Sequence, residues 1–167
     1  VYKRRALHFM LSMLLVTASA WLVWRGREGD GPKRPLVPTP IAVVAKIAAV
    51  LAFVVLVLGT MVTGSGPHSG DADEPARTGW DARSVAWLHA DAVMLFCGLV
   101  VAVLLSLFVL RSPATTRRTW IGLLVITLLQ GVLGYVQYFT GVPWVPVLFH
   151  MLGACLLVTW MTWALCS

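Results

Sequence analysis

Five long apolar runs constrain the fold of this chain more than any other feature of its sequence. They cover about residues 6–24, 41–63, 84–110, 119–139 and 144–166. Each run meets or approaches the roughly 20 residues that a helix needs to cross a bilayer. An open sheet cannot span lipid because its edge groups would lack hydrogen-bond partners, and barrel strands alternate between apolar and polar residues. We therefore predict an all-α polytopic membrane protein with five transmembrane helices and the lipid bilayer as its partner.

The basic residues predict the orientation of these helices. The net charge is +6, but the lysines and arginines flank the apolar runs, where they set topology, so we expect no nucleic-acid partner. Two segments, one after the first predicted helix and one after the third, lie on the same side of the membrane if the helices alternate in direction. Together they hold seven basic residues, namely Arg25, Arg27, Lys33, Arg34, Arg111, Arg117 and Arg118. We expect that side to be cytoplasmic, in a multi-pass protein of the cell membrane. Lys3, Arg4 and Arg5 then lie outside, against the rule, and we give the two internal segments more weight.

A glycine- and proline-rich segment, GREGDGPKRPLVPTP, divides the chain at residues 26–40. Proline disfavours helix in the residue before it, so we predict a cytoplasmic linker there. A faint repeat relates ALHFMLSMLL around His8 to LFHMLGACLL around His150. We therefore expect residues 1–25 to be the last helix of an amino-terminal half that begins upstream of this chain, and residues 41–167 to form a complete four-helix bundle.

Three histidines lie just inside apolar runs: His8, His89 and His150. An ionisable side chain at membrane depth is costly and indicates a functional site. In the predicted topology, His89 and His150 lie on parallel helices, each roughly 9 Å from the outer end at 1.5 Å per residue. Two imidazoles at one depth in a bundle suit the axial positions of a haem iron. The alternative is that each ring reaches for interfacial water; the matched depth favours a ligand pair. A partner for His8 would lie outside this chain.

Two further residues near the outer ends are candidates to hold the haem propionates. His68 lies in the polar segment 62–75, whose backbone N–H groups could also bind an anion. Arg83 precedes His89 by one and a half helical turns, and guanidinium matches carboxylate geometry. The alternatives are a solvated loop histidine and an interfacial anchor.

Small and amide residues in the runs have two readings each. Gly98 and Gly153 could let a flat macrocycle approach a helix, or could serve close helix packing. Gln130 and Gln137 are seven residues apart, so they share one face, which we expect to be interior. For these two, hydrogen bonding between helices is favoured over catalysis.

Three segments together resemble the second half of the actinobacterial haem A synthase family. They are GTMVTGSGPHSGD (59–71), WLHADAVML (87–95) and QGVLGYVQYFTGVPW…LFHMLGA (130–154). The family is an eight-helix membrane protein of two similar four-helix halves, and it oxidises a ring methyl of haem O to the formyl group of haem A. The resemblance implies that His89 and His150 ligate a low-spin haem b and that His8 is a ligand in the substrate half. It also implies that this portion alone is inactive, with the haem relaying electrons from the substrate site.

The resemblance also implies partners. These are haem O and haem A, with haem O synthase and cytochrome oxidase as candidate protein partners; a homo-oligomer stays open. Two rival functions remain: an electron-transfer cytochrome b without enzymatic activity, and an assembly subunit without a cofactor. The first would keep the haem but leave haem O unchanged, whereas the second would be colourless.

Overall fold

The computed structural model describes residues 2–28, 36–66 and 78–167. Within these ranges the regular structure is entirely helical, and five long helices account for most of it. They are α1 (Tyr2–Glu28), α2 (Thr39–Ser65), α3 (Ala82–Val109), α4 (Ala114–Phe139) and α5 (Trp144–Cys166). Each is long and apolar enough to cross a membrane. The predicted all-α fold with five membrane-spanning helices is confirmed.

The helix boundaries follow local sequence signals. Pro38, Pro113 and Pro143 directly precede α2, α4 and α5. Asp81 caps α3, because its carboxylate accepts a hydrogen bond of 2.8 Å from the backbone N–H of Ser84. A side-chain acceptor at this position satisfies one of the N–H groups that a helix start leaves unpaired.

The first helix is longer than predicted. We expected the linker to begin at residue 26, but α1 continues to Glu28. The Glu28 carboxylate accepts hydrogen bonds from Trp24 Nε1 and from Arg25, both at 2.9 Å, and these contacts one turn apart stabilise the last turn. Helix α2 likewise begins at Thr39, two residues before the predicted boundary at residue 41.

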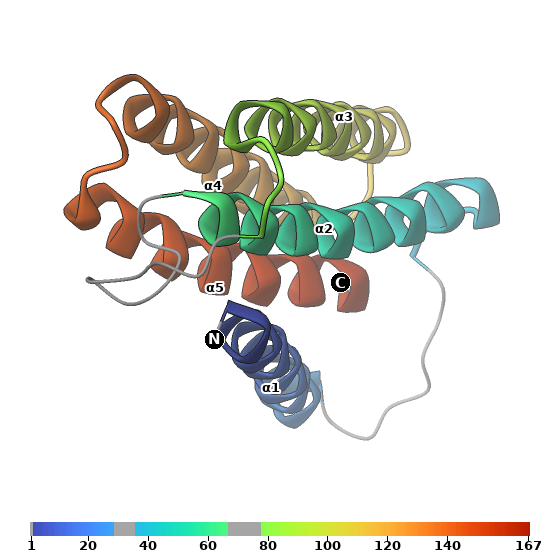
Figure 1. The fold of residues 1–167 in the computed structure, drawn as a ribbon. Coiled ribbons are helices and arrows are strands. Elements are labelled where there is room, and N and C mark those ends of the chain that lie inside the picture. Colours follow the sequence, from blue (N-terminus) through green and yellow to red (C-terminus); the bar gives the residue numbers. More distant parts are fainter. Residues whose placement is uncertain (1, 29–35, 67–77) are drawn as a thin grey trace.

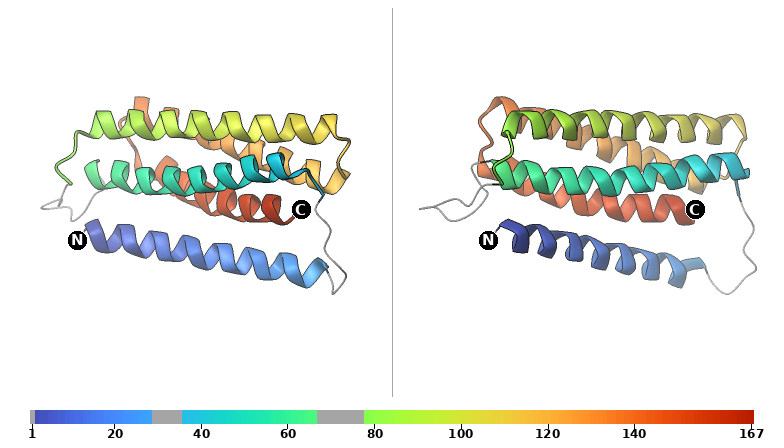
Figure 2. Two further views of the ribbon diagram at one scale, coloured as in Figure 1. Left: turned by 90° about the vertical axis from the view of Figure 1, so that its right-hand side faces the viewer. Right: turned by 45° about the vertical axis from the view of Figure 1, so that its right-hand side comes forward.

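The helices alternate in direction, and α2 to α5 form an up-and-down bundle with α1 beside it (Figures 1 and 2). Around the bundle, α2 packs on α3, α3 on α4, α4 on α5, and α5 returns to α2. Among the described residues, the diagonal pairs α2/α4 and α3/α5 have no close backbone contact. Helices α3 and α5 therefore face each other across the core, and both begin at the same end of the bundle (Figure 2).

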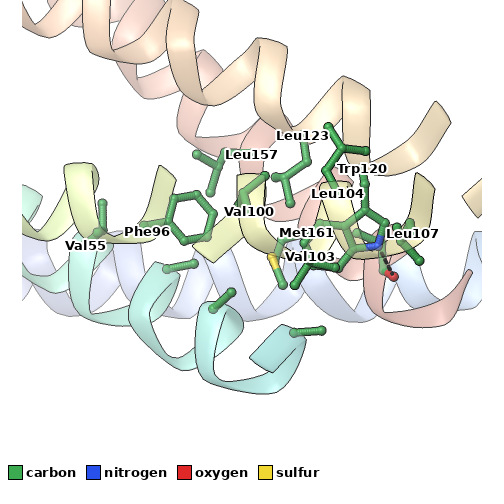
Figure 3. Packing of buried hydrophobic residues seen from close by; sticks show 14 residues of the cluster. Val55, Phe96, Val100, Val103, Leu104, Leu107, Trp120, Leu123, Leu157 and Met161 are labelled. Carbon is green, nitrogen blue, oxygen red and sulfur yellow. Dashed lines mark hydrogen bonds between the residues drawn. The ribbon is translucent and has the colours of Figure 1, made fainter. Parts of the chain in front are cut away.

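The core is a seam of buried residues that recur every three or four positions on each bundle helix. Figure 3 shows its centre, where the most buried side chains meet. The buried positions are Ala45, Ala48, Ala52 and Val55 on α2; Phe96, Val100, Val103, Leu104 and Leu107 on α3; Trp120 and Leu123 on α4; and Leu157, Met161 and Ala164 on α5. Such a spacing keeps one face of each helix toward its partners. The alanines on α2 allow close backbone approach, as small residues commonly do between membrane helices.

A tryptophan contact attaches α1 to the outside of the bundle. The indole Nε1 of Trp163 on α5 donates a hydrogen bond of 3.0 Å to the carbonyl of Ala20 on α1. Trp24 lies against the same indole, with 6.4 Å between ring centroids, and the Arg27 guanidinium lies 5.9 Å from that ring. Helix α1 thus packs beside the bundle, and none of its described residues belongs to the buried seam.

Candidate functional site

The histidines of α3 and α5 lie at corresponding places in their helices. His89 is seven residues after the first residue of α3, and His150 is six residues after the first residue of α5. At 1.5 Å per residue they are about 10 Å and 9 Å from those helix starts, which lie at the same end of the bundle. The depth expected from the sequence therefore agrees with the helix boundaries.

Both histidines extend the core seam of their helices. On α3, His89 precedes the buried Phe96 by seven residues, and on α5, His150 precedes the buried Leu157 by seven. Seven residues is two helical turns, so each histidine shares a face with a core residue. Each helix face thus carries a polar ring near the helix start and apolar side chains deeper in the bundle.

Each imidazole lies against a glycine of the neighbouring helix. A Cβ atom on Gly59 of α2 would lie 3.4 Å from Cε1 and 3.9 Å from Nδ1 of His89. A Cβ atom on Gly134 of α4 would lie 3.6 Å from Cε1 of His150. The bundle therefore has glycines on the α2/α4 diagonal and histidines on the α3/α5 diagonal at this level.

The two imidazoles are buried on one side and lack hydrogen-bond partners there. The Nδ1 atoms of His89 and His150 are both buried and make no hydrogen bond to any described residue. A buried nitrogen without a partner is costly, which marks this pair as a place where further interactions are expected.

This arrangement fits the axial ligation of a haem iron. Two histidines project inward from diagonal helices of one bundle at matched depth, and neutral imidazole nitrogens are usual iron ligands. An iron held by one nitrogen of each ring would leave the second nitrogen for a hydrogen bond to the protein, a common arrangement for ligating histidines. The donor set therefore suits the predicted group.

Of the other predicted site residues, the structure describes His8 and Arg83. His8 is exposed on α1, outside the bundle core, and its carbonyl accepts a hydrogen bond of 2.9 Å from Ser12. Arg83 is exposed in the first turn of α3, where its charge acts on the Asp81 carboxylate. His68 lies outside the described residues. Its predicted role and that of Arg83 as propionate partners stay predictions.

The glutamines lie on the interior face, as predicted. Gln137 is buried near the carboxyl end of α4, and Gln130 is partly buried one turn before Gly134. The Gln130 amide rests directly on Gly153 of α5, so a Cβ there would require the Gln130 side chain to move. Gly153 thus serves the close packing of α4 on α5. Gly98 is exposed and has nothing within 4 Å of a Cβ, so no described residue packs closely against it; its predicted role beside a macrocycle stays a prediction.

The sequence reasoning missed Gly59 and Gly134. Gly59 continues the α2 series Ala48, Ala52 and Val55 at three- and four-residue spacing, so the seam pattern carried this signal. Its pairing with His89 follows only from the packing of α2 on α3.

Comparison of the chain with protein-family models, with curated proteins and with solved structures gave no match.

Proposed function

We propose that this chain binds a low-spin haem b between α3 and α5, with His89 and His150 as axial ligands. We further propose that the haem serves a membrane oxidoreductase of the haem A synthase type, which oxidises a methyl group of haem O to the formyl group of haem A. In this proposal the histidine-bearing helix ends face the outer side of the cell membrane, because the opposite end carries the basic segments with Arg25, Arg111 and Arg117.

One observation carries the haem proposal. Two partly buried imidazoles project at one level from helices on opposite corners of the bundle, and neither Nδ1 has a hydrogen-bond partner among the described residues. Interfacial histidines that reach for water would be expected to leave that nitrogen exposed. The ligand-pair interpretation explains the burial, the matched depth and the diagonal placement together.

The residues around the pair would hold the iron and keep water away. His89 and His150 would hold it, on helices whose positions are fixed by the packed seam beneath them. The buried side chains Phe96 and Leu157, two turns deeper, would close the inner side of the site. When bound, a haem with two axial histidines supplies reversible one-electron transfer.

The enzymatic part of the proposal rests on the resemblance of three segments to the haem A synthase family. His8 supports it in one respect, since it is exposed on a helix outside the bundle at the same end. This placement leaves His8 free to serve a second site. An electron-transfer cytochrome b would use the same haem without converting haem O.

The test of the haem is a visible spectrum of the detergent-purified protein, oxidised and reduced. The variants are His89→Ala and His150→Ala, with His8→Ala as the matched control, because it removes the same side chain at a similar distance from its helix start. We expect a low-spin b-type spectrum in the wild type and in His8→Ala, and its loss in the other two. A colourless wild type after reconstitution with haem would refute the haem site.

A second assay separates the enzyme from the electron-transfer protein. The natural full-length protein is incubated with haem O in membranes, and the product is analysed by mass spectrometry. Formation of haem A that is lost with His8→Ala would support the synthase. An intact haem b spectrum with haem O left unchanged would favour the electron-transfer cytochrome.

A further inference from the structure

The glycines beside the two histidines are placed in the same way in both halves of the bundle. Gly59 lies on α2 opposite His89 of α3, and Gly134 lies on α4 opposite His150 of α5. In each case the nearest ring atom is Cε1, at 3.4 Å and 3.6 Å from the position of a Cβ. Each ring therefore rests on bare backbone of its hairpin partner.

We propose that Gly59 and Gly134 are positioning residues that hold the two imidazoles back against α2 and α4 and so keep the space between the rings open for a flat iron-bearing macrocycle. This inference rests on the proposed haem function and extends it to two residues on the other diagonal of the bundle. The glycines touch the ligands and are not themselves ligands.

The orientation of His89 supports this role. The edge that faces Gly59 is the one with Cε1 and Nδ1, whereas Nε2 lies beyond 4 Å from the same point. The contact with α2 therefore leaves Nε2 as the nitrogen farther from the neighbouring helix. This is the nitrogen that can bind iron while Nδ1 remains on the protein side.

The distances predict a graded response to side-chain size. A Cβ at 3.4 Å or 3.6 Å from Cε1 makes ordinary contact, so alanine fits and only restricts rotation of the ring. The methyl groups of valine extend beyond Cβ and come inside the roughly 3.5–4.0 Å that two carbon atoms require. The χ1 angle of valine is nearly fixed in a helix, so the methyl groups cannot easily rotate away. The ring must then move toward the centre of the bundle.

Gly131 provides a matched control. It lies on α4 and has nothing within 4 Å of a Cβ, so valine there meets open space. Gly131 is three residues from Gly134 on the same helix. The control carries the same change in helix propensity as the test variants without the contact with a histidine.

The experiment measures haem affinity and the low-spin electron paramagnetic resonance signal in the full chain reconstituted with haem b. The test variants are Gly59→Val and Gly134→Val, and the control is Gly131→Val. We expect the test variants to bind haem about 10–100-fold more weakly, as for other residues that orient metal ligands, and the control to match the wild type. Gly59→Ala and Gly134→Ala are expected to retain the haem with shifted g values.

The outcomes separate this inference from the proposed function. Wild-type haem binding that depends on the histidines, together with wild-type affinity and signals in the glycine variants, would overturn the inference alone. Equal losses in the test and control variants would also overturn it, because general helix packing would then explain the result. A wild type that binds no haem would overturn both. If the valine variants do not fold, as judged by helical circular dichroism, g values unchanged in the alanine variants would decide against it.

Discussion

Leu123 tests whether the bundle is packed within lipid or within water. It lies at the centre of α4 with none of its surface exposed, among the apolar side chains drawn in Figure 3. In soluble cores, Leu→Ala substitutions of this kind cost about 2.7–5.0 kcal/mol. That cost combines the loss of transfer from water with the loss of packing contacts. Only the second part should operate in a bilayer, because lipid tails are as apolar as leucine.

The expected magnitude follows by subtraction. Leu→Ala removes three carbon atoms, whose transfer from water is worth about 0.8 kcal/mol each, or about 2.4 kcal/mol together. Removing this from the soluble range leaves about 0.3–2.6 kcal/mol for Leu123→Ala in a membrane. Leu129 on the same helix is 63% exposed and has few contacts to lose, so Leu129→Ala should change the free energy of unfolding by less than about 0.5 kcal/mol.

The assay is equilibrium unfolding of the full chain in mixed micelles with increasing denaturing detergent, followed by helical circular dichroism. The free energy of unfolding is compared among the wild type and the two leucine variants. A loss of 4 kcal/mol or more for Leu123→Ala would refute the reasoning, since it would require a transfer term from water. Equal losses in both variants would show that Leu123 does not lie in a packed core.

Two further predictions concern helix ends and the attachment of α1. Trp163→Phe removes the donor to the Ala20 carbonyl and should weaken the docking of α1 by about 0.6 kcal/mol, a typical value for hydrogen bonds between membrane helices; spin-label distances between α1 and α5 should broaden, and an unchanged distribution would contradict this. At the start of α3, hydrogen bonds from Ser84 lower the pKa of Asp81 below its usual 3.8. Because the pKa is lowered in the folded protein, the cap stabilises the helix when the pH is above the usual pKa of the carboxyl group. This stabilisation is lost as the pH falls through the lowered pKa. The Ser84 amide resonance should therefore shift in acid below pH 3.8, and Asp81→Asn, which keeps an acceptor but does not titrate in this range, should abolish that shift; persistence of the shift in the variant would contradict the cap assignment.

Much of the fold could be predicted because its determinants are local. Runs of about 20 apolar residues, flanked by prolines such as Pro38 and Pro113, predict membrane helices without reference to the rest of the chain. Successive membrane helices alternate in direction, so the direction of each follows from its place in the chain. The depths of His89 and His150 follow from the helix rise per residue. The predicted end of α1 was wrong by a few residues because the helix continues beyond the apolar run, to Glu28, whose carboxylate accepts hydrogen bonds from Trp24 and Arg25 within the last turn.

The candidate site was only half predictable for a physical reason. Sequence spacing placed the two histidines at one level, because depth depends on position along a single helix. It could not say that α3 and α5 are diagonal, that α1 stands outside the bundle, or that Gly59 and Gly134 support the rings. These facts depend on which helices become neighbours, and that choice is made by the packing of side chains from all of the helices together. The sequence by itself therefore determined the number, length and depth of the elements, whereas only the tertiary structure decided which residues face each other across the core.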